Sequence, residues 1–213
     1  MRMKKALALI LITALLVVPV IAAETPTFTD TNGHWGQEFI DEAARRGLFK
    51  GFGDGTFRPD TAVTRAQFVT VLWRMAGNPA VTAQTPFTDI ADQIDEFRTA
   101  IAWAYEKGYV NGTTETTFAP GDSLTRESAM KILFGYAGGQ SGMEAMFTNV
   151  YDSVFTDSSA ISAWAKAPMY WGVYNTLISG TGDKTLSPQG IATRAQLAKI
   201  LVNYIEKFEG GRK

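Results

Sequence analysis

A short sequence motif occurs three times in this chain with the same internal spacing, and it constrains the fold more than any other feature. Each copy is a Phe-x-Pro or Leu-x-Pro turn followed, five residues after its proline, by Thr-Arg. The copies begin at Phe57, Phe118 and Leu186, and a Phe-Thr-Asp sequence precedes each, with 29 to 31 residues from its Asp to the turn proline. The chain is therefore an internal repeat of three units, and such units must pack together to bury a core.

The first 23 residues have the pattern of a secretory signal peptide. A basic start at Arg2, Lys4 and Lys5 precedes an apolar run that ends in small residues. This order of charge, apolar run and small residues is typical of a cleaved leader. The alternative is an uncleaved anchor helix, but the run is at the lower edge of spanning length and contains a proline. We therefore expect cleavage after Ala22 or Ala23, export, and no stable membrane insertion of the mature chain.

The composition of the remaining chain excludes several classes of function. Without the leader it has 17 Lys and Arg against 21 Asp and Glu, a net charge of −4. A mildly acidic protein lacks the basic surface that nucleic-acid binding requires. The chain has no cysteine and one histidine, His34, which excludes disulfides and most structural zinc sites. No cofactor and no metal site are predicted.

Each unit is predicted to form a helix, a glycine-rich turn and a second helix. The predicted units and the connector after the second of them are 24–80, 81–140, 141–154 (connector) and 155–213. A helix pair of about 50 residues cannot bury enough apolar surface alone, whereas three pairs packed together can. We therefore expect an all-α domain, three helix-loop-helix repeats with approximate threefold symmetry, in which the second helices meet near the axis.

Local signals place the helices within the units. In the first unit a helix is predicted from Trp35 to Arg46, ending at Gly47, which is a common helix stop. A second helix is predicted after Thr64, where apolar residues follow at helical spacing. In the third unit Pro168 falls inside the first predicted helix, so we expect an interruption with Pro168 opening a fresh turn of helix.

The Thr-Arg step is predicted to be a helix start. Thr64 followed by Gln67 has the pattern of a capping box, and Thr193 followed by Gln196 repeats it. Thr125 has the cap residue but lacks a Gln or Glu three positions later. The threonines therefore have a structural role, worth about 1 kcal/mol each.

Capping does not explain the three arginines. Arg65, Arg126 and Arg194 each take the first helical position, where the helix dipole disfavours a cation. An arginine beside unpaired helix amides makes a strong anion site, because guanidinium binds carboxylate in a fork geometry. We predict that the three arginines face solvent and bind an anion. The alternatives are an ion pair with an acidic residue of a neighbouring unit, or an idle residue copied by duplication.

Two further sets of residues repeat and are candidates for ligand contact. Gly51, Gly112 and Gly180 each stand eight residues before a turn proline. They are predicted to supply positive φ in a turn, and secondarily to let a ligand approach the backbone. Trp103 and Trp171 share one position of the first helix. If exposed they suit stacking on sugar faces, and the alternative is burial against another unit.

The repeated motifs resemble those of S-layer homology domains. The resemblance rests on Phe-Thr-Asp, a Trp-containing first helix, Gly-x-Gly-Asp-Gly-Thr-Phe-Arg-Pro from Gly51, and Val-Thr-Arg-Ala-Gln from Val63. It covers residues 28 to about 208 and is strongest in the first unit. The second unit departs from the pattern at Glu96, which stands in place of the Trp, and the third replaces the turn's Phe with Leu186.

The resemblance implies a three-pronged pseudo-trimer that anchors an exported protein non-covalently to cell-wall polysaccharide, often one with pyruvylated sugars. It implies a ligand in the grooves between prongs, contacted by the repeated arginine, by loop glycines and by aromatic residues. In this sequence those residues are Arg65, Arg126, Arg194, Gly51, Gly112, Gly180, Trp103 and Trp171. The implied location is the cell wall or surface layer.

Two other functions compete with anchoring. A wall-degrading enzyme would need paired carboxylates across a cleft, but Asp30, Asp89 and Asp157 each recur beside Phe-Thr, as turn or cap residues would. We therefore predict that the protein is not an enzyme. A structural coat protein whose units self-assemble is the second alternative.

Under the anchoring hypothesis, replacing Arg65 and Arg194 together by alanine should weaken wall binding and leave thermal stability nearly unchanged.

Overall fold

The computed structural model describes residues 27–139, 146, 147, 149 and 151–210. The predicted signal peptide and half of the predicted connector lie outside these residues. Six α-helices are described, together with short 3₁₀ and π turns: α1 (Gln37–Arg45), α2 (Arg65–Met75), α3 (Asp95–Glu106), α4 (Arg126–Tyr136), η1 (Ser158–Ala160), η2 (Ala163–Ala165), α6 (Lys166–Tyr174), α7 (Arg194–Tyr204) and η3 (Ile205–Glu209). Only isolated β-bridges accompany the helices in this part of the chain, so the all-α prediction is confirmed. No helix in it has the length and apolar character needed to cross a membrane.

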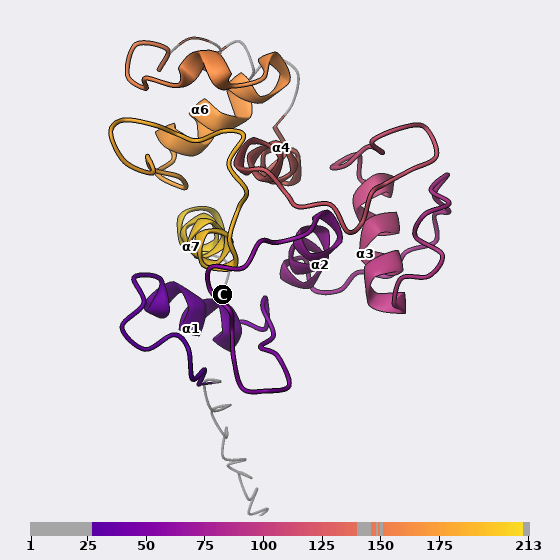
Figure 1. Ribbon diagram of the computed structural model, residues 1–213. Helices are drawn as coiled ribbons and strands as arrows, with labels where there is room; N and C mark the ends of the chain where they lie inside the picture. Colours follow the sequence, from indigo (N-terminus) through magenta and orange to yellow (C-terminus); the bar gives the residue numbers. More distant parts are fainter. Residues whose placement is uncertain (1–26, 140–145, 148, 150, 211–213) are drawn as a thin grey trace, which may run out of the picture.

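The second helices of the three units lie at the centre of the molecule. Figure 1 shows α2, α4 and α7 around a common axis, with α1, α3 and α6 outside them. The outer helices pack on the inner ones in the pairs α3 on α2, α6 on α4 and α1 on α7. Each lobe therefore combines the second helix of one unit with the first helix of the next, and α7 closes the circle onto α1. The predicted threefold arrangement is confirmed, with packing pairs that are offset from the sequence units.

A ring of backbone hydrogen bonds joins the three units just before the inner helices begin. The amide of Val63 donates to the carbonyl of Ala192 at 3.1 Å, and the amide of Ala192 donates to Leu124 at 2.8 Å. The amide of Leu124 completes the ring by donating to Val63 at 2.9 Å. All three side chains are buried. Each of these three amides therefore donates to a carbonyl of another unit, so each unit depends on the other two for its backbone hydrogen bonds at this point.

The helix starts follow the predicted caps. Thr64 and Thr193 each make both hydrogen bonds of a capping box. Thr125 accepts from the amide of Ser128 without the return bond, as predicted. In the third unit the 3₁₀ turn η2 ends at Ala165 and α6 begins at once, so that Pro168 is the third helical residue. The interruption is confirmed, but the prediction that Pro168 opens the new turn is wrong, because α6 starts two residues earlier at Lys166. Pro168 is tolerated there because first-turn amides need no helical partner.

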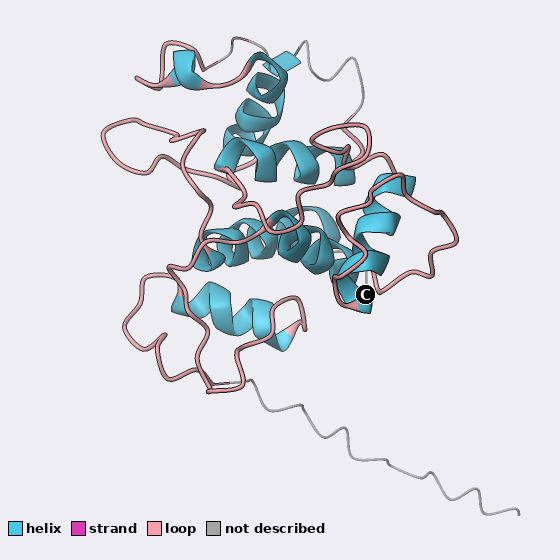
Figure 2. Ribbon diagram, turned by 45° about the vertical axis from the view of Figure 1, so that its right-hand side comes forward, coloured by secondary structure: helices cyan, strands magenta, loops and turns pink. Residues whose placement is uncertain are grey.

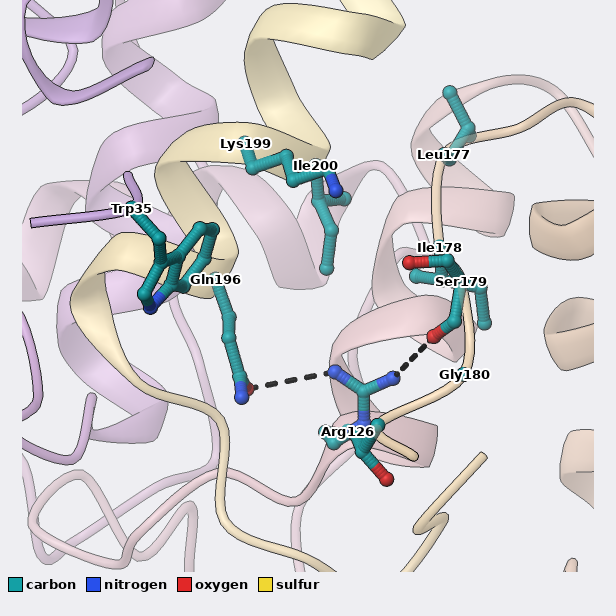
Figure 3. Close-up of a pocket in the computed structure, with 10 residues that line it drawn as sticks. Trp35, Arg126, Leu177, Ile178, Ser179, Gly180, Gln196, Lys199 and Ile200 are labelled. Atoms are coloured by element: carbon teal, nitrogen blue, oxygen red, sulfur yellow. Dashed lines mark hydrogen bonds between the residues drawn. The ribbon is translucent and has the colours of Figure 1, made fainter. Parts of the chain in front are cut away.

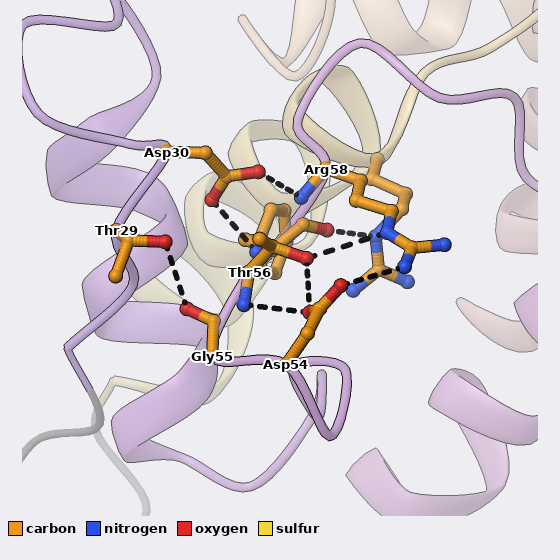
Figure 4. Close-up of polar contacts among 8 residues, drawn as sticks. Thr29, Asp30, Asp54, Gly55, Thr56 and Arg58 are labelled. Atoms are coloured by element: carbon orange, nitrogen blue, oxygen red, sulfur yellow. Dashed lines mark hydrogen bonds and ion pairs between the residues drawn. The ribbon is translucent and has the colours of Figure 1, made fainter.

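An aspartate holds each Phe-x-Pro or Leu-x-Pro turn. The carboxylate of Asp30 accepts the amides of Phe57 at 2.8 Å and Arg58 at 2.7 Å (Figure 4). Asp89 and Asp157 do the same in the other units. The residue between the Phe or Leu and the proline is left-handed in every unit, with φ of 59°, 58° and 50°, a conformation that non-glycine residues adopt at a cost. The interpretation of these aspartates as turn residues is confirmed.

Candidate functional site

The three repeated arginines hold the units together. Arg65 donates from Nε to the carbonyl of Phe118 at 2.9 Å and from Nη2 to that of Asn111 at 3.2 Å. Both acceptors belong to the second unit, whereas Arg65 belongs to the first. Phe118 is the first residue of the next unit's Phe-x-Pro turn, and Asn111 directly precedes its repeated glycine, Gly112.

The same two bonds recur around the circle. Arg126 donates to the carbonyls of Leu186 at 2.9 Å and Ser179 at 3.2 Å, both in the third unit. Arg194 donates to Phe57 at 2.7 Å and Lys50 at 2.9 Å, which returns to the first unit. The partners are backbone carbonyls rather than carboxylates, and among the described residues the alternative of an ion pair is not found.

The arginines do not simply face solvent, and this part of the prediction is wrong. Arg126 and Arg194 are buried and Arg65 is half-buried. The guanidinium of Arg194 lies 4.3 Å from the ring centroid of Phe57, and that of Arg65 lies 4.7 Å from that of Phe118. Burial lowers the pKa of all three arginines, that of Arg194 to about 10. They remain cations at neutral pH and keep a charge inside the protein.

The amides at the helix starts are also occupied. The amide of Arg65 donates to the carbonyl of Asp122 at 3.0 Å, and that of Ala66 donates to Pro120 at 3.1 Å. The other two inner helices have the same pair of bonds to the turn of the next unit. The expectation of unpaired helix amides beside each arginine is therefore wrong, because tertiary contacts satisfy them. An anion at this place must be bound by side chains.

One nitrogen of each guanidinium is left for such contact. Nη1 of Arg126 makes only a long hydrogen bond of 3.4 Å to Oε1 of Gln196 (Figure 3). Nη1 of Arg65 and of Arg194 has no hydrogen-bond partner among the residues that the structure describes. Each of these nitrogens belongs to an arginine that lines a groove on the surface. We call these the Arg65, Arg126 and Arg194 grooves.

Every groove is built from all three units. The Arg126 groove, with a volume of about 280 Å³, combines that arginine with the loop at Ser179 and Gly180, with Lys199 of α7, and with Trp35 of the first unit. Figure 3 shows Arg126, Gln196 and Trp35 along it. Trp35 is 56% exposed, and Nζ of Lys199 lies 6.0 Å from its ring centroid. A cation and an aromatic face thus stand side by side in one cavity.

The other two grooves repeat this plan with different side chains. The Arg65 groove, of about 260 Å³, contains Lys131 of α4 and Trp164 of the third unit, which is 50% exposed. The Arg194 groove is smaller, about 160 Å³, and contains Thr70 and Phe97 instead. It also contains the cations Lys50 and Arg74. Each groove thus contains one of the repeated arginines, but the side chains around that arginine differ among the three grooves.

The repeated glycines are required for a reason other than the predicted one. Gly51, Gly112 and Gly180 are absent from the residues with positive φ, so that prediction is wrong. A Cβ at Gly112 would lie 2.1 Å from the carbonyl oxygen of Thr114, and one at Gly51 would lie 2.3 Å from Cε1 of Phe28. Close packing of the turn excludes a side chain there. Gly180 itself lines the Arg126 groove.

Trp103 and Trp171 lie outside the grooves. They are 3% and 4% exposed, which is the burial alternative that the sequence left open. Both line a cavity of about 890 Å³ at the other end of the inner helices, with Tyr136 and Phe208 among its other residues. The exposed groove tryptophans are Trp35 and Trp164.

Sequence reasoning did not select the groove lysines or the groove tryptophans as site residues, although a signal was present. Lys131 and Lys199 each stand five residues after a repeated arginine. Trp35 and Trp164 each stand 24 residues before a turn proline. Aligning the three units on the repeated arginine and on the turn proline would have identified all four residues.

The sequence model of the S-layer homology domain matches this chain at residues 27–69, 86–130 and 154–198. These segments cover more than half of the chain and contain the turn, the cap and the arginine of every unit. The chain belongs to the S-layer homology domain family. Membership in this family indicates a location at the cell surface and a role in anchoring there.

Similar proteins are much longer than this chain. The exoglucanase XynX of Acetivibrio thermocellus is 29% identical over 88% of this chain and 17% of its own length. The surface-layer 125 kDa protein of Lysinibacillus sphaericus is 29% identical over 92% and 16%. A cellulosome-anchoring protein of A. thermocellus is 32% identical over 50% and 25%. The chain thus spans a quarter or less of these three relatives, and the shared part is the S-layer homology region.

Proposed function

We propose that this S-layer homology protein anchors to the cell envelope by binding an anionic cell-wall polysaccharide in its grooves. The observation that carries the proposal is that a lysine and an exposed tryptophan line the same groove as a repeated arginine in two places, Lys199 with Trp35 and Lys131 with Trp164. A sugar with a pyruvate ketal has a carboxylate next to an apolar ring face. The two groups of each groove match these two parts of the ligand.

The chemistry of binding follows from the atoms that remain available. The ligand carboxylate would accept from Nη1 of the arginine and, in the Arg126 groove, from Nζ of Lys199, and charged hydrogen bonds of this kind are among the strongest in proteins. The sugar ring would stack on the indole, which is apolar and rigid. Because the arginine is fixed by two carbonyls, it would lose little side-chain freedom on binding. No cofactor or metal is required.

Retention on purified cell walls tests the proposal. We expect native walls to retain the protein, and walls stripped of their polysaccharide to release it. Replacing Lys199 by glutamine should weaken retention with little change in stability, since its side chain lies at the surface of the Arg126 groove. A matched variant, Lys184→Gln, lies outside the grooves and should be retained like the unchanged protein. Equal retention on stripped walls would contradict polysaccharide binding.

A second candidate function is self-assembly into a coat without specific glycan binding. It is favoured by the relatives that are named as surface-layer proteins, such as the S-layer protein sap of Bacillus anthracis, 26% identical over 90% of this chain. Sedimentation velocity over a range of concentrations, without glycan, distinguishes the two. Anchoring predicts a monomer, and coat formation predicts growth of oligomers with concentration.

A further inference from the structure

We infer that Glu127 is a positioning residue that holds Trp164 at the Arg65 groove. The inference rests on the proposed function, in which that indole stacks on the sugar, and it adds a residue that does not itself line the groove. Glu127 reaches the tryptophan through Ser162, the residue at which the short turn containing Trp164 begins.

Trp164 lies on an element that is too short to fix its own place. It is the middle residue of η2, and the amide of Ala165 closes this turn by donating to the carbonyl of Ser162 at 2.8 Å. A helix of one turn gains little stability from its own hydrogen bonds. Trp164 is also 50% exposed, so its neighbours cover only half of it. The position of the indole therefore depends on what holds the start of the turn.

A buried carboxylate holds that start by two hydrogen bonds. Oε2 of Glu127 accepts from the amide of Ser162 at 3.0 Å, and Oε1 accepts from the hydroxyl of Ser162 at 2.8 Å. Nε2 of Gln189 donates to the same Oε1 at 2.8 Å. Glu127 is 2% exposed, and a buried carboxylate is costly unless its oxygens are hydrogen-bonded. These bonds therefore fix η2 on α4, the helix against which it packs.

The third inner-helix partner shows that this carboxylate is particular to one lobe. Glu127 follows Arg126 directly, and the residues that follow the other two repeated arginines are Ala66 and Ala195. In the lobe of α7 and α1, a Cβ added at Gly36 would lie 3.2 Å from Cβ of Ala195. Small residues thus bring α1 directly against α7, whereas a hydrogen-bonded side chain joins η2 to α4.

The tryptophan of the first unit is held from the same direction by other residues. Gln189 follows the turn proline of the third unit, and Asp60 follows that of the first. Oδ1 of Asp60 lies 3.3 Å from Nε2 of His34, the residue before Trp35. The second unit lacks a tryptophan at this position and has Gly121 after its proline. A side chain from the turn therefore accompanies each groove tryptophan, which is expected if its task is to position the indole.

A double-mutant cycle on wall retention of the full chain separates positioning from general stability. The variants are Glu127→Ala, Trp164→Ala and the two together, with Glu127→Gln as the conservative exchange. A carboxamide at position 127 can still accept from Ser162, and Gln189 can turn its own amide over to face it. Val69→Ala is the stability control, because Val69 is buried and lines none of the three grooves. Melting curves confirm that each variant is folded at the temperature of the assay.

We expect Glu127→Ala and Trp164→Ala each to weaken retention about tenfold, as the loss of one aromatic contact does. The double variant should be no weaker than either single variant, because both changes remove the same contact. Glu127→Gln and Val69→Ala should be retained nearly like the unchanged protein. In protein labelled with fluorotryptophan, the fluorine resonance that disappears in Trp164→Ala should shift in Glu127→Ala, and this readout needs no glycan.

Three results would overturn the inference while leaving glycan anchoring intact. They are full retention of Glu127→Ala, a double variant weakened by the product of the two single effects, and a fluorine resonance of Trp164 that does not move in Glu127→Ala. If stripped walls retain the unchanged chain as well as native walls do, the proposed function fails instead. The fluorine measurement then still decides whether Glu127 positions Trp164.

Discussion

At the scale of single residues, the repeated positions are explained by what each side chain touches. The aspartates accept two amides of a left-handed turn, and the arginines donate to two carbonyls of the next unit. The glycines leave room where a Cβ would meet a carbonyl or a ring. In all three cases the residue satisfies or accommodates the backbone of a turn, which is why its neighbours in sequence vary among the units and it does not.

Replacing Gly112 by alanine tests the packing argument. The new Cβ would lie 2.1 Å from the oxygen of Thr114 and 2.5 Å from that of Thr117, so the turn must shift. We expect a loss of about 1–3 kcal/mol in the free energy of unfolding, as for other overpacked sites, measured by urea denaturation. Gly53→Ala is the control, because its Cβ would meet nothing within 4 Å. Equal stability of the two variants would contradict the argument.

The turn aspartates predict a dependence of stability on acid. Burial acts to raise the pKa of Asp30, but the amides of Phe57 and Arg58 outweigh it, and the pKa lies below the ordinary 3.8. A carboxyl with a lowered folded pKa contributes stability that is fully present above its ordinary pKa and is lost as the pH falls through the folded value. We therefore expect Asp30→Asn to be less stable than the unchanged protein at pH 7, with the difference shrinking below pH 4. Urea midpoints at pH 7, 4 and 3 measure it, and a constant difference would count against this role.

At the scale of elements, each inner helix begins at a junction between units. Its threonine caps the helix locally, while its first two amides and its arginine bond to the turn of the next unit. The helix dipole disfavours the positive charge of the arginine at this end, and the two carbonyls that accept its hydrogen bonds offset that cost. The helix start is therefore both a local motif and the contact that joins one unit to another.

Replacing Arg126 by alanine should reveal this joining role. The variant leaves the carbonyls of Leu186 and Ser179 without their donor, and an unsatisfied buried group costs about 1–3 kcal/mol. We expect a loss of about 2–4 kcal/mol for the two together, measured by thermal and urea unfolding. Arg45→Ala is the matched control, because Arg45 is exposed and pairs with Glu42 of its own helix, and exposed pairs contribute little. The contacts of Arg126 with the two carbonyls revise the expectation that arginine variants keep their stability, which is why wall binding is better tested with Lys199.

At the scale of the whole molecule, the fold is a closed circle of three units. Each outer helix packs on an inner helix of the preceding unit, and α1 packs on α7 from the far end of the chain (Figure 1). Figure 2 shows that loops connect the helices and that the described residues contain no strand. The backbone ring through Val63, Leu124 and Ala192 has the same closure. The first and last units are therefore neighbours, and each groove needs residues from all three.

A chain that ends at residue 140 tests the closure. It would lack α6, the partner of α4, and α7, the partner of α1, so that two of the four remaining helices would expose their buried faces. We expect the full chain to unfold in one cooperative transition and the shortened chain to show none, as seen by calorimetry and by amide NMR dispersion. A cooperative transition in the shortened chain would show that the units fold independently.

The sequence by itself determined the parts of this protein that depend on local and periodic patterns. The threefold repeat, the all-α class, the capping boxes at Thr64 and Thr193 and the central place of the second helices all follow from spacing and apolar periodicity. These features are set by residues close in the chain or by the requirement that short helices share a core.

The tertiary structure alone decided what the repeated residues contact. Helical phase could not tell that Trp103 and Trp171 are buried while Trp35 and Trp164 are exposed, because the neighbour that covers a helix comes from another unit. Nor could it show that the arginines bond to carbonyls of the next unit, or that Glu96 of the second unit pairs with Arg74 of the first. Those outcomes depend on which segments the circular closure brings together, and side chains far apart in the sequence meet only there.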